Sequence, residues 1–249
     1  MTPLPLISII MNSFNSQRYL QEAVESAINQ TYPNWEIIFW DNCSDDDSLD
    51  IISQFEDSRI HSFIAPYRMS LAEGRNNAIQ KSQGQWIAFL DCDDIWAPTK
   101  LEKQLALLTK SSLKNIGLIY TRTESFSSRG TEGETIYQYS DKPLPDGQLL
   151  EILLLEGNII PLVSTIISRT AYDVCGGIPN HLTFAEDYWL FTAISEKFSI
   201  ACIQDILSYY RVHEQSATYQ NKLSSHQEAL LVLENWRHHL SDDKFQNRY

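Results

Sequence analysis

The sequence has few cysteines and no long apolar run. Its four cysteines show no CxxC pairing and no regular spacing, which argues against a zinc site or a disulfide framework. No apolar stretch approaches the roughly 18 to 20 residues that a bilayer span needs, and the opening MTPLPLIS lacks the basic region of a signal peptide. We therefore expect a cytoplasmic protein without a transmembrane segment.

Basic residues are also scarce. The sequence has 19 lysines and arginines against 32 aspartates and glutamates, and its formal net charge is −13 with neutral histidines. A surface of this sign opposes contact with a phosphate polymer or an anionic bilayer. Nucleic acid is therefore not an expected partner, whereas a transient encounter with a lipid-linked substrate stays open.

What is present is an alternation of strand-like and helix-like segments. Hydrophobic residues make up 43% of the 249, as in ordinary globular proteins. Apolar runs and helical spacings follow each other at 6–11, 20–28, 35–40, 60–64, 71–79 and 86–90. This order is typical of βαβ units and predicts a mostly parallel α/β sheet covered by helices on both faces. Such sheets bind ligands beyond the carboxyl ends of their strands.

The pattern changes after residue 119. A polar segment at 125–134 predicts a loop or hairpin, and the following spacings predict strands at 162–167 and 198–203 and helices at 148–155, 187–196 and 225–240. Ser225 and Glu228 match a capping box for the last helix. This helix either closes the domain or forms a homodimer contact.

Acidic side chains gather where the predicted strands end. Asp41 and Asn42 follow one strand, Asp91-Cys92-Asp93-Asp94 follows another, and Glu186-Asp187 precedes a helix. Carboxylate oxygens suit Mg²⁺ or Mn²⁺ bridging a diphosphate, so Asp91-x-Asp93 is a candidate metal clamp. The alternatives are that the DxD residues only cap a turn and that Glu186-Asp187 only begins a helix.

The stretch GQWIAFLDCDDIWAPTKLEKQ resembles the DxD region of family 2 glycosyltransferases, which have the GT-A fold. Other segments resemble the family's motifs in the correct order: LISIIMNSFNSQRYLQEAVESAINQTYPNWEIIFWDNCSDDDS, EGRNNAIQKSQG, CGGIPNHLTFAEDYWLFTAI and YRVHEQSAT. The joint match is more specific than any one piece. It implies a GT-A domain over 1–220, with a donor-binding half at about 1–120 and an acceptor-side half at about 121–220 that carries a small antiparallel extension. A C-terminal helix and tail then occupy 221–249.

The resemblance also implies roles for individual residues. Those expected to bind the nucleotide or its phosphates are Asn15, Asp41, Asn42, Arg75 and Asp91. Those expected to hold Mg²⁺ or Mn²⁺ are Asp93, Asp91 and His213. Asn42 stands where the family has a second Asp, and its amide both donates and accepts, so the nucleobase is less determined.

In the same resemblance Asp187 would be the catalytic base, and Glu186 would orient it or contact the acceptor. A divalent cation can absorb the charge of a departing diphosphate, which leaves one carboxylate to deprotonate the attacking hydroxyl. Direct displacement of this kind inverts the anomeric carbon, whereas a glycoside hydrolase needs two flanking carboxyl groups. We therefore expect an inverting transferase that uses a UDP- or dTDP-linked sugar and a glycan or lipid-linked acceptor in polysaccharide or glycoconjugate synthesis.

Two other functions remain open at this point. A nucleotidyltransferase would also use a nucleotide fold with carboxylate-bound Mg²⁺, but it usually has a glycine-rich phosphate loop, and residues 12–18 contain no glycine. A non-catalytic module that binds nucleotide sugars could keep the same fold. The presence of Asp93, Asp187 and His213 together favours the enzyme.

Overall fold

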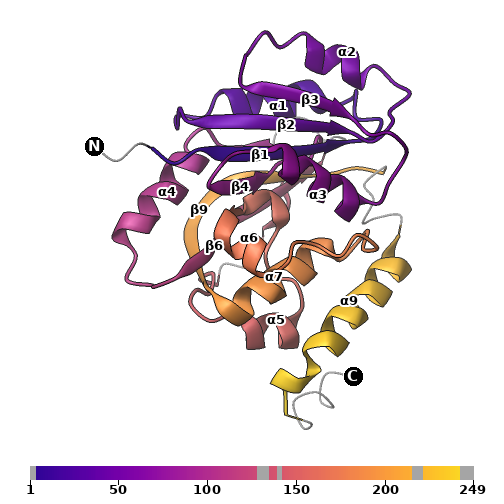
Figure 1. The fold of residues 1–249 in the computed structure, drawn as a ribbon. Coiled ribbons are helices and arrows are strands. Elements are labelled where there is room, and N and C mark those ends of the chain that lie inside the picture. The colour runs from indigo at the N-terminus through magenta and orange to yellow at the C-terminus, as the bar shows by residue number, and fades with distance from the viewer. Residues whose placement is uncertain (1–3, 128–134, 139–141, 215–220, 242–249) are drawn as a thin grey trace.

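The computed structural model describes residues 4–127, 135–138, 142–214 and 221–241. Within them the strands form one nine-stranded sheet in the order β3-β2-β1-β4-β8-β6-β9-β5, and β7 pairs with β6 (Figure 1). The strands are β1 (Ile7–Ser13), β2 (Trp35–Asp41), β3 (Ile60–Ile64), β4 (Trp86–Phe89), β5 (Ile95–Trp96), β6 (Ile116–Ser127), β7 (Thr135–Gln138), β8 (Ile166–Ser168) and β9 (Ser199–Val212).

The strand directions determine which side chains meet. Strands β1 to β4 run parallel to one another, as their pairings show. Strand β8 is antiparallel to both β4 and β6, so β6 and its parallel partner β9 again run in the direction of β4. The carboxyl ends of β1, β2, β4 and β9 therefore lie at one edge of the sheet. The predicted mostly parallel sheet with an antiparallel extension is confirmed.

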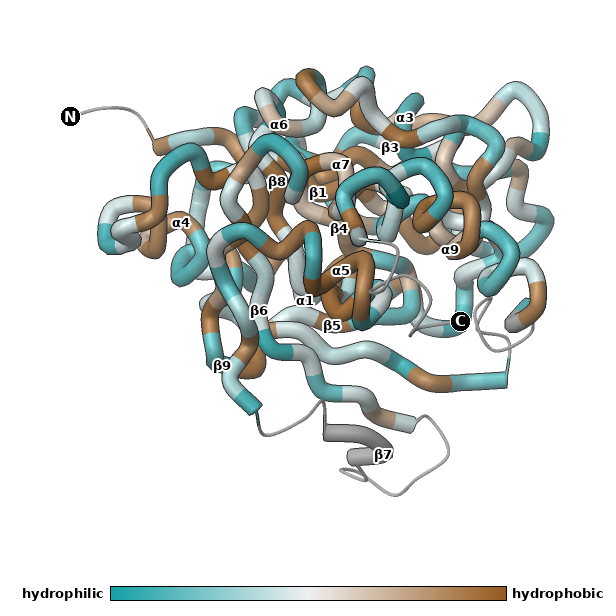
Figure 2. The backbone as a smooth tube through the Cα atoms, turned by 90° about the horizontal axis from the view of Figure 1, so that it is seen from below, coloured by the Kyte–Doolittle hydropathy of each residue, from teal (hydrophilic) through white to brown (hydrophobic). Residues whose placement is uncertain are grey.

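Helices cover both faces of the sheet. The helices are α1 (Leu20–Ile28), α2 (Ser48–Ser53), α3 (Leu71–Lys81), α4 (Lys100–Lys110), α5 (Leu150–Glu156), α6 (Arg169–Val174), α7 (Glu186–Lys197) and α9 (Lys222–Trp236), with short 3-10 helices η1 (Leu162–Ser164) and η2 (Arg237–His239). Ile9 of β1 belongs to a core cluster that includes residues of α1, α2 and α4, whereas Ile10 belongs to a second cluster that includes residues of the other five helices. The apolar α5, brown in Figure 2, belongs to the second group.

Two predicted strands have different bounds in the structure. The run 162–167 divides into η1 and β8, because Pro161 precedes η1 and Ser164 donates its N–H back to the Pro161 carbonyl. The predicted strand at 198–203 is the first part of β9, which continues to Val212 by pairing with the whole of β6. Of the predicted loop at 125–134, residues up to Ser127 belong to β6, and 128–134 lie outside the described residues.

The last helix begins earlier than the predicted 225. Helix α9 starts at Lys222, and Ser225 donates its N–H to the Asn221 carbonyl, so Ser225 and Glu228 do not form a capping box. Its Val232, Leu233 and Trp236 are buried in the core shared with α7, so the helix closes the domain. In the described part of the chain, no helix is long and apolar enough to cross a bilayer.

Candidate active site

A cleft of about 920 Å³ lies at the carboxyl edge of the sheet. Loops after β1, β2, β4 and β9 line it, together with the start of α7 and the residues after α5. Every site residue predicted from the sequence except Asp41 lines this cleft: Asn15, Asn42, Arg75, Asp91, Asp93, Glu186, Asp187 and His213. The fold therefore brings together acidic residues that are far apart in the sequence.

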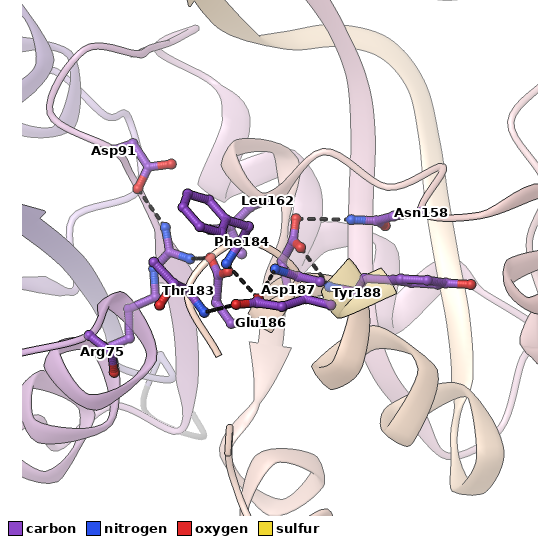
Figure 3. A network of polar contacts seen from close by, with 12 residues as sticks. Arg75, Asp91, Asn158, Leu162, Thr183, Phe184, Glu186, Asp187 and Tyr188 are labelled. Carbon is purple, nitrogen blue, oxygen red and sulfur yellow. Dashed lines mark hydrogen bonds and ion pairs between the residues drawn. The ribbon is translucent and has the colours of Figure 1, made fainter. Parts of the chain in front are cut away.

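Arg75 links the two halves of the cleft (Figure 3). It lies on α3 with a side chain only 3% exposed, and its Nη2 donates to Asp91 Oδ1 at 2.8 Å. Its Nη1 donates to Glu186, the first residue of α7. Burial alone would lower the pKa of Arg75, but the charges of Asp91 and Glu186 more than offset this effect and raise it. The guanidinium therefore stays charged and joins the DxD turn to α7.

Asp187 is the half-buried carboxylate beside this ion pair. Its Oδ2 accepts a hydrogen bond from Asn158 Nδ2 at 2.9 Å, and its Oδ1 accepts one from its neighbour's backbone, Tyr188 N, at 2.6 Å. Burial raises the pKa of Asp187 to about 6, against the lowering effects of Arg75 and these hydrogen bonds. Burial likewise raises the pKa of Glu186, which the Arg75 charge opposes. Asp187 thus combines a fixed orientation with a basicity suited to proton transfer near neutral pH.

The DxD turn is attached to the end of β9. Ile95 and Trp96 of β5 pair antiparallel with β9, immediately after the turn. Arg211 donates its backbone N–H to Asp94 Oδ1 at 2.9 Å and its Nε to the Asp93 carbonyl at 2.8 Å. Two residues later, His213 Nε2 lies 2.9 Å from Asp93 Oδ2. Asp93 and His213, both expected from the sequence to hold a metal, therefore lie side by side, and their metal binding stays a prediction.

These residues fit a divalent cation. Asp93 Oδ2 and His213 Nε2 lie 2.9 Å apart on the cleft wall, and the side chains of Asp91 and Asp93 are 36% and 31% exposed. Asp91 forms an ion pair with Arg75. Among the described residues, one group of three His, Cys, Asp or Glu side chains has its possible ligand atoms within 4.8 Å of one another. It lies elsewhere, at Glu196, His238 and His239. Mg²⁺ and Mn²⁺ sites commonly use one or two protein ligands together with substrate phosphates, so two converging side chains are sufficient.

The loops after β1 and β2 are tied to each other. Asn15, with φ 52°, donates its Nδ2 to Asp45 Oδ1 at 2.7 Å and accepts from Asp45 N at 3.0 Å. Asn42 similarly donates to and accepts from the Met69 backbone, at 2.9 and 3.0 Å. Asp41 is fully buried and its Oδ2 accepts from Ser44 N at 2.9 Å, away from the cleft wall. In this geometry Asp41 shapes the loop, and its contact with a nucleotide stays a prediction.

Three residues in or next to the site were not predicted from the sequence to contribute to it. Asn158 follows Gly157, whose φ of 89° ends α5 and directs the chain towards the cleft. Arg211 lies in the YRVH segment next to the predicted His213. Glu228 lies far along the chain, in α9, and binds the turn before α7. A glycine at a helix end was the available signal for Asn158, whereas no local pattern indicates the contact of Glu228.

Comparisons with known proteins identify sequence relatives of this chain. The family described as "Glycosyl transferase family 2" matches residues 8–152. The chain is 42% identical over 110 residues to the "Putative teichuronic acid biosynthesis glycosyltransferase TuaG" of Bacillus subtilis (strain 168), an alignment that covers 43% of this chain and only 44% of that protein. It is 31% identical over 221 residues, 87% of this chain and 81% of the relative, to the Escherichia coli "UDP-Glc:alpha-D-GlcNAc-diphosphoundecaprenol beta-1,3-glucosyltransferase WfgD".

Two solved structures share the fold at low sequence identity. S. aureus TarS 1-349, crystallised in complex with UDP-GlcNAc, superposes with a TM-score of 0.70 at 19% identity, covering 84% of this chain and 59% of that one. The mannosyltransferase PcManGT from Pyrobaculum calidifontis, in complex with GDP-Man and Mn²⁺, also has a TM-score of 0.70, at 16% identity over 97% of this chain and 66% of that one. The matched segment, the relatives and the shared architecture lead to one conclusion: the chain belongs to glycosyl transferase family 2.

Proposed function

We propose that this protein is an inverting glycosyltransferase that moves a sugar from a nucleotide diphosphate to an acceptor hydroxyl. The observation that carries the proposal is the meeting of the Asp93–His213 pair and the Asp187 carboxylate on the walls of one cleft. These groups match the two requirements of the reaction, charge compensation at the leaving group and a base for the acceptor. Arg75 joins the two sides and keeps their spacing.

The donor side would bind a nucleotide diphosphate with a divalent cation, Mg²⁺ or Mn²⁺. When bound, this cation would offset the negative charge that develops on the departing diphosphate. Asp93 and His213 would hold it, while Asp91, Asn15 and Asn42 line the adjoining wall. In support, the solved neighbours carry UDP-GlcNAc in one case and GDP-Man with Mn²⁺ in the other. The UDP- or dTDP-linked donor expected from the sequence remains part of the proposal.

On the acceptor side, Asp187 would accept the proton of the attacking hydroxyl. Its raised pKa of about 6 makes the carboxylate a stronger base than an ordinary Asp, yet keeps it ionised at neutral pH. Asn158 and the Tyr188 N–H fix the orientation of the carboxylate. Attack from this side, opposite the leaving diphosphate, inverts the anomeric carbon. A nucleotidyltransferase has no need of a base placed in this way.

The acceptor is proposed to be a glycan, free or lipid-linked, in polysaccharide or glycoconjugate synthesis. The name of the E. coli relative specifies a diphosphoundecaprenol-linked acceptor, and that of the B. subtilis relative specifies teichuronic acid biosynthesis. An acceptor of this kind would be met at the inner face of the membrane, in keeping with the cytoplasmic location expected from the sequence.

The test is a donor screen followed by a binding measurement. UDP-glucose, UDP-GlcNAc, dTDP-glucose and GDP-mannose are each added with Mn²⁺, and both the melting temperature and sugar release are measured. We expect one donor to raise the melting temperature and to be hydrolysed slowly. If none does either, the proposed transferase function fails.

Calorimetry with the matching nucleoside diphosphate and Mn²⁺ then tests the metal ligands. We expect Asp93→Ala to weaken binding by about 10- to 100-fold, because one of two protein ligands is lost. Asp50→Ala removes an exposed carboxylate from α2 and serves as the control, with unchanged affinity. Equal affinity of the Asp93→Ala variant and the wild type would remove Asp93 from the metal site.

A further inference from the structure

The turn before α7 is bound by a side chain from α9. Glu228 Oε2 accepts backbone N–H hydrogen bonds from Thr183 at 3.0 Å, Phe184 at 2.8 Å and Ala185 at 3.0 Å. Its Oε1 lies 3.1 Å from the same Thr183 nitrogen. Successive amides thus converge on one carboxylate that is more than 40 residues away in the sequence.

This contact satisfies a requirement of α7 that the local sequence does not meet. The first N–H groups of a helix and of the turn before it lack intrahelical acceptors, and they carry partial positive charge. The N-cap residue is Ala185, whose methyl side chain cannot accept a hydrogen bond, and no side-chain cap is formed there. The Glu228 carboxylate supplies both the acceptor and the negative charge.

The same turn is part of the cleft. Thr183 and Phe184 line it, and after the N-cap Ala185 the first turn of α7 begins with Glu186 and Asp187 (Figure 3). Because three consecutive amides point at one carboxylate, the backbone of 183–185 has little freedom to rotate. The direction in which α7 starts, and hence the direction of the Asp187 side chain, depends on this contact.

Glu228 is itself held in place, because α9 is attached to the other end of α7 as well. Glu196, near the end of α7, accepts from Trp236 Nε1 at 3.3 Å and lies 3.0 Å from His239 Nε2. The rings of Trp189 and Trp236 meet edge to face at 4.8 Å between centroids. Helix α9, yellow in Figure 1, therefore contacts both ends of α7, through Glu228 near its own middle and through Trp236 at its end.

We propose that Glu228 is a positioning residue for sugar transfer, which sets the orientation of the Asp187 carboxylate by binding the three amides that precede α7. The inference rests on the proposed role of Asp187 as the base. It extends the site beyond the residues that touch substrate and gives the C-terminal helix a part in the reaction.

Four single variants test the proposal. Glu228→Ala removes the acceptor, and Glu228→Asp keeps the charge but is one methylene too short to reach the amides. Glu228→Gln keeps a carbonyl oxygen that can accept from them. Glu234→Ala is the control, because Glu234 is an exposed residue of the same helix. Each is assayed well below its own melting temperature, with saturating donor and Mn²⁺.

We expect kcat for transfer to fall about 10- to 100-fold in Glu228→Ala and Glu228→Asp, the scale expected when a catalytic group is displaced by about an ångström. The KM for the donor and the affinity for UDP with Mn²⁺ should stay within about twofold, since the donor side does not contact Glu228. Glu228→Gln should recover most of the rate. Wild-type kcat in Glu228→Ala, or an equal loss in Glu228→Gln, would overturn the positioning role.

A measurement that needs no activity separates this inference from the proposed function. Amide hydrogen exchange at Thr183, Phe184 and Ala185 should be faster in Glu228→Ala than in the wild type and in Glu234→Ala. If the wild-type chain transfers no sugar from any donor, the proposed function fails, and the exchange data still report on the contact. Unchanged exchange at these amides would refute the contact by itself.

Discussion

The two sides of the cleft are built in different ways. The proposed donor wall contains Asp91 and Asn42, and the proposed acceptor wall contains Asp187. On the donor wall, Asn42 directly follows β2 and Asp91 lies two residues after β4, and the pairing of β1, β2 and β4 places them at one edge. On the acceptor wall, Asp187 is oriented by a side chain from another loop and by a turn that α9 holds. Strand pairing brings the residues of the first wall together before side-chain contacts fix their loops, whereas the orientation of Asp187 depends on contacts with another loop and with a turn held by α9. The acceptor wall should therefore be more sensitive to distant substitutions.

The largest expected effect is a loss of sugar transfer without a loss of nucleotide binding. Asp187→Asn removes the proposed base and keeps the shape of the side chain, so we expect transfer to fall by about 10²- to 10⁴-fold, the usual contribution of a general base. Affinity for UDP with Mn²⁺, measured by calorimetry, should be nearly unchanged, because the donor wall does not contain Asp187. Full turnover by this variant would show that the base lies elsewhere.

The next effect tests the residue that joins the walls. Arg75→Met leaves Glu186 buried without its charged partner, so we expect the free energy of unfolding in urea to fall by about 3–5 kcal/mol. Adding Glu186→Gln should restore part of this loss, because the unpaired charge is removed. The control is Arg59→Met, whose half-exposed ion pair with Asp57 should contribute about 1 kcal/mol or less. Similar losses of unfolding free energy in Arg75→Met and Arg59→Met would mean that the buried Arg75 ion pair contributes no more to stability than a surface ion pair.

The smallest expected effect is a gradual change of kcat/KM with pH. Asp187 acts as a base only when ionised, and its pKa is raised to about 6, so kcat/KM should fall about tenfold for each pH unit below 6. Asn158→Ala removes a hydrogen bond that lowers this pKa, and should therefore move the acid limb to higher pH. An acid limb that does not move in Asn158→Ala would show that another group controls it.

Stability should respond to Asp187 in the opposite direction. The native state binds the Asp187 proton below about pH 6, whereas an unfolded Asp binds it only near its ordinary value of 3.8. This group therefore makes the fold relatively more stable as the pH falls through that window. Thermal melts recorded across the same pH range will distinguish loss of the base from acid unfolding.

The donor wall could be predicted from the sequence because its signals are local. The apolar run at 86–90 contains β4 (Trp86–Phe89), and the acids that follow it lie at the sheet edge. The acceptor wall depends on contacts that no short window contains. Glu228 follows Ser225 at capping-box spacing, yet its carboxylate serves another helix. Likewise the polar Gln204 and Asp205 interrupt the apolar pattern, so the length of β9 follows only from its pairing with β6.

Strand β8 has only three residues, yet it determines what the C-terminal half can contribute. Because β8 is antiparallel to both β4 and β6, β9 runs in the same direction as β1. The carboxyl ends of β1 and β9 therefore lie at the same edge of the sheet. An imidazole near the end of the polypeptide can thereby reach a carboxylate encoded in its first hundred residues. The family match ends at residue 152, so the segment that identifies this protein contains neither His213 nor Asp187. A fragment cut at that point would keep the signature of the family and lose the proposed base and one proposed metal ligand.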